Sequence, residues 1–332
     1  MSTANTRSSH QHFAGVTFLA AALCVAGCAG GAQTDAQGQS DLTSAASSGY
    51  AKTKYPIVLV HGMSGFKTIL GVVDYFHGVP ESIRGSGGTV YVTEASPFNS
   101  PEQRGEQVLA QIESIVARTG CGKVNLIGHS QGGLDVRYVA AVRPDLIASV
   151  TTVGTPHKGA ALADFLRSHL KNGGFDQAVA AALANSLGFL LSVLEGQPTL
   201  PENAVAGLDA LTSAGTSSFA AKYPNGIPSS SCGQGAASSN GIAQYSWSGT
   251  GVLTNILDVT DGSLFLSSLV YPEANDGLVG HCSSHFGTVI RDDYRLNHLD
   301  EVNQVLGLTA LFGTDPVELF RAHANRLKIK GL

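Results

Sequence analysis

The chain has 332 residues, of which 43% are hydrophobic and 14% are charged, and its net charge is −5 with a pI of about 6.1. This hydrophobic content is above that of disordered chains, and the length suits one large α/β domain or two small ones. The acidic balance gives no electrostatic basis for binding nucleic acid, and no apolar run of 18 residues follows the N-terminal region, which excludes a multi-pass membrane protein.

The first 28 residues are typical of an export signal. One basic residue, Arg7, precedes the apolar stretch FAGVTFLAAALCVAGC (13–28), which is too short and too rich in small residues for a membrane span. Its final VAGC is similar to a lipobox, in which Cys28 would be acylated and anchor an outer-membrane lipoprotein. Ordinary cleavage nearby would instead yield a secreted, extracellular protein. The aperiodic Gly, Ser, Gln and Ala-rich residues 29–50 predict a flexible leader.

Strand and helix patterns alternate from residue 54 onwards. Short apolar runs with β-branched residues predict strands, and apolar residues spaced three or four apart predict helices. The predicted strands are 54–62, 89–96, 123–128 and 147–154, and the predicted helices are 100–120 and 132–142. Such alternation is typical of a mostly parallel sheet with helices on both faces, and reactive groups gather at the carboxyl ends of its strands.

The segment from about 158 to 200 is helical in pattern and unusually apolar. Its apolar stripe consists of Val179, Leu183, Leu187, Leu190 and Leu194, and polar residues at 185 and 186 interrupt the run. Two interpretations remain open. The segment is either a core helix or a mobile lid whose apolar inner face covers an active site until an interface draws it open.

The motif LIGHSQGGLDV (126–136) places Ser130 between Gly128 and Gly132, at a predicted strand-to-helix turn. A G-x-S-x-G turn of this kind presents a nucleophilic serine. With 40 glycines in the chain, chance puts a glycine on both sides of a serine about once in seventy serines, so the motif alone is only a hypothesis.

A nucleophilic serine needs a base and an orienting acid, which follow it in the order Asp or Glu, then His, in α/β-hydrolases. Asp276 in EANDGLVG, after a predicted strand SSLVY (267–271), and His298 in RLNHLDEVNQ stand in that order. An Asp-Gly pair in isolation usually marks only a turn. Together with the serine motif, the order and spacing favour a Ser-His-Asp triad.

The same chemistry requires two backbone N–H groups that bind the oxyanion of the tetrahedral intermediate. The residue after the nucleophile, Gln131, offers one. The loop VHGMSGF (60–66) follows an early predicted strand and offers the other at Met63, which Gly62 and Gly65 bracket.

Five cysteines are present, and the first two, Cys24 and Cys28, belong to the predicted signal. Cys232 and Cys282 lie in Gly/Ser-rich loop sequence and are the better disulfide pair in an exported protein. Cys121, beside a predicted strand, would then be a free and buried thiol.

These motifs resemble those of the secreted triacylglycerol lipases of the Pseudomonas and Burkholderia type (bacterial lipase family I). The resemblance covers about residues 50–332 and includes KYPIVLVHGMSGF, VNLIGHSQGG, TVGTPHKG, EANDGLVG and NHLDEVNQ. It implies an α/β-hydrolase catalytic domain over 51–332 with a helical lid. The residues it implies are the triad Ser130, Asp276 and His298, the oxyanion donors Met63 and Gln131, and the disulfide Cys232–Cys282.

The resemblance also implies one structural Ca²⁺ ion, held by Asp258, Asp300 and the backbone carbonyls of Gln304 and Leu308. Ca²⁺ prefers carboxylate and carbonyl oxygens. Because Asp300 stands two residues from His298, an ion there would fix the loop that positions the base. A lipase-specific foldase is implied as a partner, although no motif in the chain bears on it.

We therefore expect a monomeric lipase that hydrolyses long-chain acylglycerols at a lipid–water interface through an acyl-enzyme. A short-chain carboxylesterase or polyester depolymerase on the same fold is the alternative, because a fold does not determine its substrate. A non-catalytic lipid-binding surface protein is a further alternative. A metal-dependent hydrolase is disfavoured, since the eleven histidines form no H-E-x-x-H pattern.

Overall fold

The computed structural model describes residue 1 and residues 49–63, 68–69, 73–171, 203–305, 307–310 and 313–332. The predicted export signal, nearly all of the leader and the apolar stripe at 179–194 lie outside these ranges. Within them, no helix combines the length and the hydropathy that a membrane span requires.

A seven-stranded sheet forms the centre of the described part, in the order β4-β1-β5-β6-β8, with β7 and β9 both paired to β8. All pairings are parallel except that of β7 with β8. The strands of this sheet are β1 (Ile57–Val60), β4 (Val90–Val92), β5 (Val124–His129), β6 (Ile147–Val153), β7 (Ser238–Ser239), β8 (Ile242–Gly249) and β9 (Thr288–Tyr294). A separate antiparallel pair consists of β2 (Thr68–Ile69) and β3 (Val73–Asp74).

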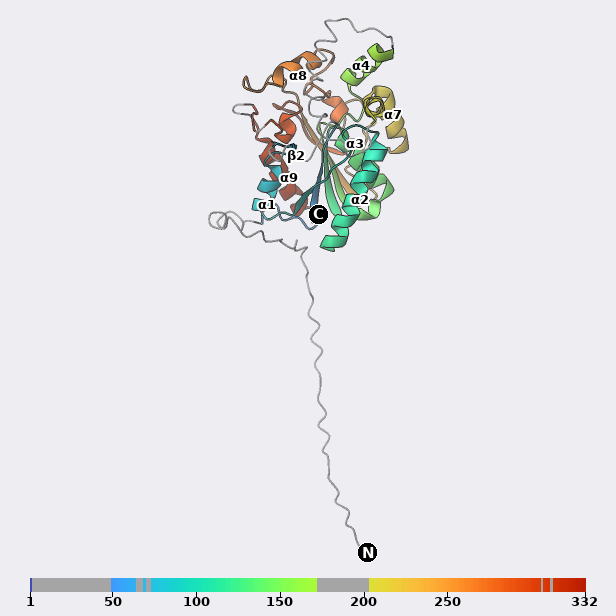
Figure 1. Ribbon diagram of the computed structural model, residues 1–332, viewed down its shortest axis with the longest axis vertical. Coiled ribbons are helices and arrows are strands. Elements are labelled where there is room, and N and C mark those ends of the chain that lie inside the picture. Colours follow the sequence, from blue (N-terminus) through green and yellow to red (C-terminus); the bar gives the residue numbers. More distant parts are fainter. Residues whose placement is uncertain (2–48, 64–67, 70–72, 172–202, 306, 311–312) are drawn as a thin grey trace.

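Helices cover both faces of this sheet, with α1 and α9 on one side and α2 and α3 on the other (Figure 1). The described helices are α1 (Val79–Gly85), α2 (Pro101–Thr119), α3 (Gln131–Val142), α4 (Ala161–Lys171), α6 (Ala204–Leu211), α7 (Ser213–Lys222), α8 (Asp261–Ser268) and α9 (Pro316–Ile329). The four strands predicted between residues 54 and 154 and the two predicted helices are therefore confirmed, with shorter limits at some ends.

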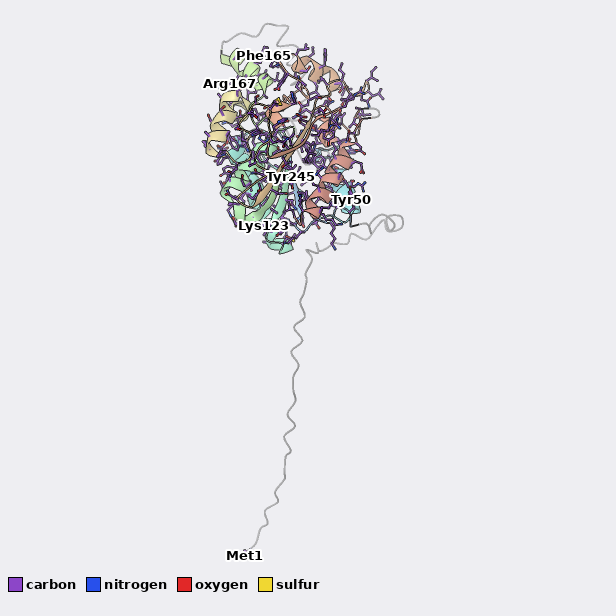
Figure 2. The ribbon with its side chains drawn as sticks, turned by 180° about the vertical axis from the view of Figure 1, so that it is seen from behind. Met1, Tyr50, Lys123, Phe165, Arg167 and Tyr245 are labelled. Carbon is purple, nitrogen blue, oxygen red and sulfur yellow. A yellow bond between two sulfur atoms is a disulfide. The ribbon has the colours of Figure 1, made fainter. Side chains whose placement is uncertain are left out.

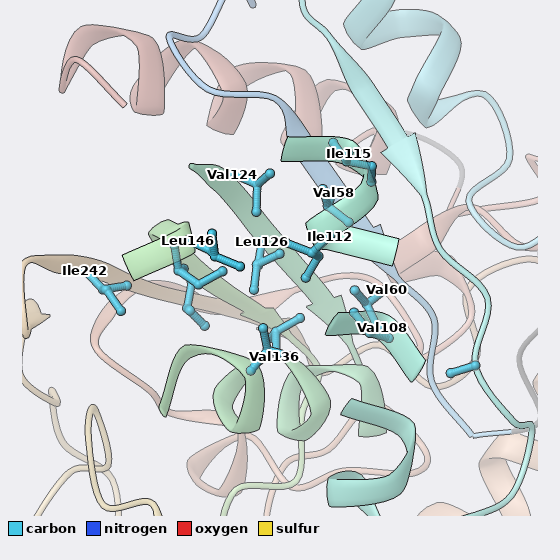
Figure 3. Close-up of a cluster of buried hydrophobic side chains, with 14 of the residues drawn as sticks. Val58, Val60, Val108, Ile112, Ile115, Val124, Leu126, Val136, Leu146 and Ile242 are labelled. Carbon is cyan, nitrogen blue, oxygen red and sulfur yellow. The ribbon is translucent and has the colours of Figure 1, made fainter. Parts of the chain in front are cut away.

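Side chains of β1 alternate between two hydrophobic clusters, as the pleat of a strand requires. Ile57 and Leu59 pack toward α1 and α9, whereas Val58 and Val60 pack toward α2 and α3. Figure 3 shows the second cluster, which joins β1 and β5 to three buried side chains of α2, namely Val108, Ile112 and Ile115. Both faces of the sheet are thus buried, which explains its continuous apolar strands.

The polarity of the parallel strands defines two ends of the molecule. Lys123 stands just before β5 and lies at one end, while Phe165 and Arg167 of α4, which follows β6, lie at the other (Figure 2). The chain's last residue, Leu332, accepts a hydrogen bond from the N–H of Lys54 at 2.6 Å, just before β1. The C-terminus therefore lies at the amino ends of the strands, opposite to α4.

Two predictions about local structure are wrong. The stretch SSLVY (267–271) forms the end of α8 and the turn after it, because a short apolar run does not distinguish strand from helix. Cys121 is half-buried and disulfide-bonded rather than a free thiol. That expectation came from elimination, which carries no information about contacts in space. The disulfide Cys232–Cys282 is confirmed, with the two Cα atoms 4.5 Å apart.

Candidate active site

Ser130 occupies a strained turn between β5 and α3. Its φ of 55° and ψ of −128° define a backbone conformation that residues with a side chain rarely adopt. A Cβ at Gly128 would lie 2.3 Å from the carbonyl oxygen of Gly132, and a Cβ at Gly132 would lie 2.5 Å from that of His61. Both glycines are therefore required by close backbone contacts, so the motif is a structural turn and not a product of the glycine-rich composition.

The loop after β1 packs directly against this turn. A Cβ at Gly62 would lie 2.6 Å from the Cβ of Ser130, so only glycine allows the two segments to approach this closely. Gln131 begins α3, and its backbone N–H has no acceptor within the helix. The positive end of the helix dipole adds to the attraction that this N–H offers to an anion.

A fully buried arginine holds the carbonyl groups of the loop after β1. Arg104 of α2 donates to the carbonyl oxygen of His61 at 2.7 Å and to that of Gly62 at 3.2 Å. It also forms an ion pair with Asp135 of α3 at 2.8 Å and donates to the carbonyl of Ser96. The guanidinium thus joins α2, α3 and the loop through one side chain.

The imidazole of His61 also forms a hydrogen bond with the carbonyl oxygen of Gly62. Its Nε2 accepts from the N–H of Ala95 at 3.1 Å, so Nδ1 carries the proton and donates to the Gly62 carbonyl at 2.9 Å. Burial, with the charge of Arg104, lowers the pKa of His61 to about 3, so the ring is neutral. Because a trans peptide directs its C=O and N–H in opposite directions, the N–H of Met63 faces away from Arg104.

His298 and Asp276 form a buried pair. Nδ1 of His298 lies 2.8 Å from Oδ2 of Asp276, whose other oxygen accepts from the N–H groups of Leu278 and Val279 at 2.8 and 2.7 Å. The pairing leaves Nε2, on the opposite side of the ring, for proton transfer. The His298 ring centroid lies 4.6 Å from that of His129, the residue before Ser130. No hydrogen bond joins Ser130 to His298 among the residues described.

A second buried network of hydrogen bonds includes His129. The sequence analysis did not predict this network. The hydroxyl of Tyr75 accepts the N–H of Gly62 at 3.0 Å and lies 2.6 Å from Nδ1 of His129. Nε2 of His129, on the other side of the ring, lies 3.5 Å from Oε2 of Glu301. Ligand atoms of His129, His298 and Glu301 lie within 4.8 Å of one another.

Burial, with the nearby charge of Asp276, raises the pKa of the Glu301 carboxyl well above its usual range. Its other oxygen accepts the N–H of Gly249 at 2.6 Å. No local pattern in the sequence indicates that Glu301 faces His129, because it lies in one short loop with Asp300 and only the tertiary structure shows which side each acid faces.

The four residues expected to hold Ca²⁺ present several oxygens that lack other partners. Oδ2 of Asp258 is buried without a hydrogen bond, and the backbone carbonyls of Gln304 and Leu308 accept none from the residues described. Burial, with the charges of Asp258 and Asp261 nearby, raises the pKa of Asp300 to about 7. Clustered buried carboxylates and unpaired carbonyl oxygens are the donor set of a hard cation, so these residues fit Ca²⁺.

Comparisons with known proteins agree with this arrangement. A family model for the alpha/beta hydrolase fold matches residues 55–302. A triacylglycerol lipase of Vibrio cholerae is 55% identical over 284 residues, which cover 86% of this chain and 91% of the relative. The triacylglycerol lipase of Burkholderia plantarii is 42% identical over 320 residues, covering 85% and 88%.

A solved structure supports the fold alone. The crystal structure of a mature Bacillus licheniformis lipase aligns with a TM-score of 0.56 at 20% identity, covering 77% of this chain and 89% of that one.

Proposed function

The chain belongs to the bacterial triacylglycerol lipases of the α/β-hydrolase fold, and from this premise we propose that Ser130, His298 and Asp276 hydrolyse acylglycerol esters through an acyl-enzyme. The observation that carries the assignment is the strained Ser130 turn, which packs against Gly62. The ring centroid of His129, the residue before Ser130, lies 4.6 Å from that of His298, which is paired with Asp276. A serine hydroxyl is a weak nucleophile until a positioned base takes its proton.

In the proposed reaction, Oγ of Ser130 attacks the ester carbonyl while Nε2 of His298 takes the hydroxyl proton. Asp276 keeps Nδ1 protonated and stabilises the imidazolium that forms. The N–H groups of Met63 and Gln131 bind the oxyanion, and His298 then gives its proton to the departing alcohol. Water, activated by the same histidine, hydrolyses the acyl-enzyme and restores Ser130.

Arg104 supports this step by holding the Gly62 carbonyl, so the oxyanion donor is oriented before substrate binds. A preorganised donor does not have to reorient during the reaction, which is the main source of its effect on the transition state. Arg104 is thus proposed as a positioning residue, while the N–H groups themselves contact the substrate.

A bound Ca²⁺ would contribute to structure rather than to chemistry in this proposal. Asp258 and Asp300 would hold it with the carbonyls of Gln304 and Leu308, and its charge would neutralise carboxylates that burial otherwise forces toward protonation. The loop from 297 to 308, which carries His298, would then be held in place from its far side.

We also propose that the mature protein is exported and acts as a monomer on long-chain acylglycerols at a lipid–water interface. The disulfide Cys232–Cys282 supports an oxidising compartment. A foldase remains a proposed partner, tested by whether the denatured mature chain refolds to activity by itself.

The test is a comparison of Ser130→Ala with Ser218→Ala, an exposed serine of α7. We expect the first variant to lose hydrolysis of p-nitrophenyl butyrate and labelling by a fluorophosphonate, and the second to keep both. If Ser130→Ala keeps both the hydrolysis and the labelling, the assignment is refuted. Hydrolysis of emulsified triolein then separates a lipase from an esterase that accepts only soluble tributyrin.

A further inference from the structure

One short stretch of the chain exposes an unusual number of large apolar side chains. Ile256 is 97% exposed and Val259 is 85% exposed, values that mean almost no packing against the rest of the protein. We define the 253–269 surface by its seven exposed apolar residues, which are Leu253, Ile256, Leu257, Val259, Phe265, Leu266 and Leu269. Elsewhere in the described ranges, exposed large apolar residues are isolated, and scattered single residues need no explanation.

The 253–269 surface carries no exposed charge. Between residues 250 and 272 the chain has no Lys, Arg or His, and its two acids, Asp258 and Asp261, are both buried. The carboxylate of Asp261 accepts the N–H groups of Thr254 and Asn255 at 2.6 and 2.8 Å. The acids therefore face inward and hold the loop, while the apolar side chains face solvent.

Hydrogen bonds attach this surface to the segments that carry the acid and the base. Oγ of Ser267 in α8 donates to the carbonyl of Gly277 at 2.7 Å, next to Asp276. The amide of Asn297, next to His298, donates to Asp261 at 2.8 Å. In Figure 1, α8 lies at the same end of the molecule as α4 and far from the C-terminus. The surface therefore lies at the end to which the strands direct the proposed active site.

We propose that the 253–269 surface is the face that inserts into the neutral lipid phase of the substrate. This inference rests on the proposed function, because an acylglycerol substrate forms a separate apolar phase that the enzyme must reach. Transfer of exposed apolar side chains from water into that phase is favourable, and no charge on the surface has to be desolvated. The absence of Lys and Arg means that attraction to anionic headgroups makes no contribution.

The experiment uses the full mature protein and the double variant Ile256→Ser/Val259→Ser, whose side chains make too few contacts to affect folding. Ile329→Ser is the matched control, because Ile329 is also 75% exposed but lies three residues before the C-terminus, at the opposite end. Binding to triolein droplets is measured by depletion from the aqueous phase. Binding to phosphatidylcholine vesicles is measured with and without an anionic lipid, and p-nitrophenyl butyrate reports on the chemistry away from any interface.

We expect the double variant to bind droplets at least about tenfold more weakly than the wild type, with unchanged turnover of the soluble ester. The Ile329→Ser variant should match the wild type, and anionic lipid should not increase binding. Equal droplet binding by all three proteins overturns the proposal. So does a wild-type dimer in sedimentation that the double variant converts to a monomer, because a second copy would then be the occupant. If the wild type does not hydrolyse the soluble ester, the proposed function itself is refuted instead.

Discussion

Nδ1 of His298 lies 2.8 Å from Oδ2 of Asp276, and the backbone N–H of His298 also donates to the carbonyl of Asp276 at 2.9 Å. The two residues are 22 positions apart and belong to different loops, so their double connection fixes the ring relative to the acid in both position and tautomer.

Substituting Asp276→Asn should lower kcat for p-nitrophenyl butyrate by about 100-fold or more, because an amide cannot hold the protonated imidazole in place. Glu301 places a second carboxyl group near the His298 ring, so Asp276→Asn/Glu301→Gln should lose further activity. Thermal unfolding checks that both variants fold. A kcat of Asp276→Asn within threefold of the wild-type value would contradict the orienting role of Asp276.

Removing Arg104 should destabilise the protein and disturb the oxyanion loop together. Arg104→Met leaves the buried carboxyl of Asp135 without its partner, which costs about 3–5 kcal/mol in the free energy of unfolding. Arg321→Met breaks an exposed ion pair with Glu318 and should cost less than about 1 kcal/mol. Urea denaturation measures both. We also expect a lower kcat for Arg104→Met but not for Arg321→Met. Equal losses of stability in the two variants would argue against a stabilising role of the Arg104–Asp135 pair.

The stability of the protein should fall in acid partly through His323. Burial, with the charge of Arg326, lowers the pKa of this histidine to about 3, below the value of about 6.5 in an unfolded chain. The unfolded state therefore binds more protons between these values, so stability is present above pH 6.5 and is lost as pH falls. At pH 5 the loss from one such histidine is about 2 kcal/mol relative to pH 7.5.

The variant His323→Gln tests this sign. Its own loss of unfolding free energy between pH 7.5 and pH 5 should be smaller than that of the wild type by about 2 kcal/mol, whatever its stability at pH 7.5. Urea midpoints at the two pH values supply the comparison. Parallel losses in the two proteins would mean that His323 is protonated in the folded state.

The disulfide should contribute substantially to stability, because it closes a loop with a sequence separation of 50. In the chain-entropy model, a loop of this size corresponds to about 4 kcal/mol. We expect Cys232→Ser/Cys282→Ser to lose most of that amount in chemical denaturation while keeping its turnover of the soluble ester at low temperature. A loss below about 1 kcal/mol would show that the unfolded chain is constrained in some other way.

Chelation with EGTA should lower the Tm of the wild type, because the buried carboxylates of Asp258 and Asp300 would lose their neutralising cation. Asp258→Asn should start from a lower Tm and respond little to EGTA. The exposed Asp293, paired with Arg291, provides the control, since Asp293→Asn should keep the wild-type response. Calcium titration by calorimetry gives a second measurement. An unmoved Tm after exhaustive chelation removes the metal from the proposal.

Local features of this protein were predictable from sequence because their causes lie within a few residues. Ser100 caps the start of α2 and Gly120 ends it with a φ of 66°, as the pattern of that stretch predicts. The alternation of apolar runs with helical spacing likewise indicated a parallel sheet, and the two glycines around Ser130 marked the turn that the structure contains.

The tertiary structure alone decided which polar groups are buried and which apolar groups are exposed. Arg104 reaches His61 across 43 positions, and Glu301 reaches His129 across 172, so no local pattern distinguishes either from a surface charge. The same limit made Cys121 look free and left the 253–269 surface unrecognised. Exposure depends on what the rest of the chain places over a residue, and that is a property of packing between distant segments.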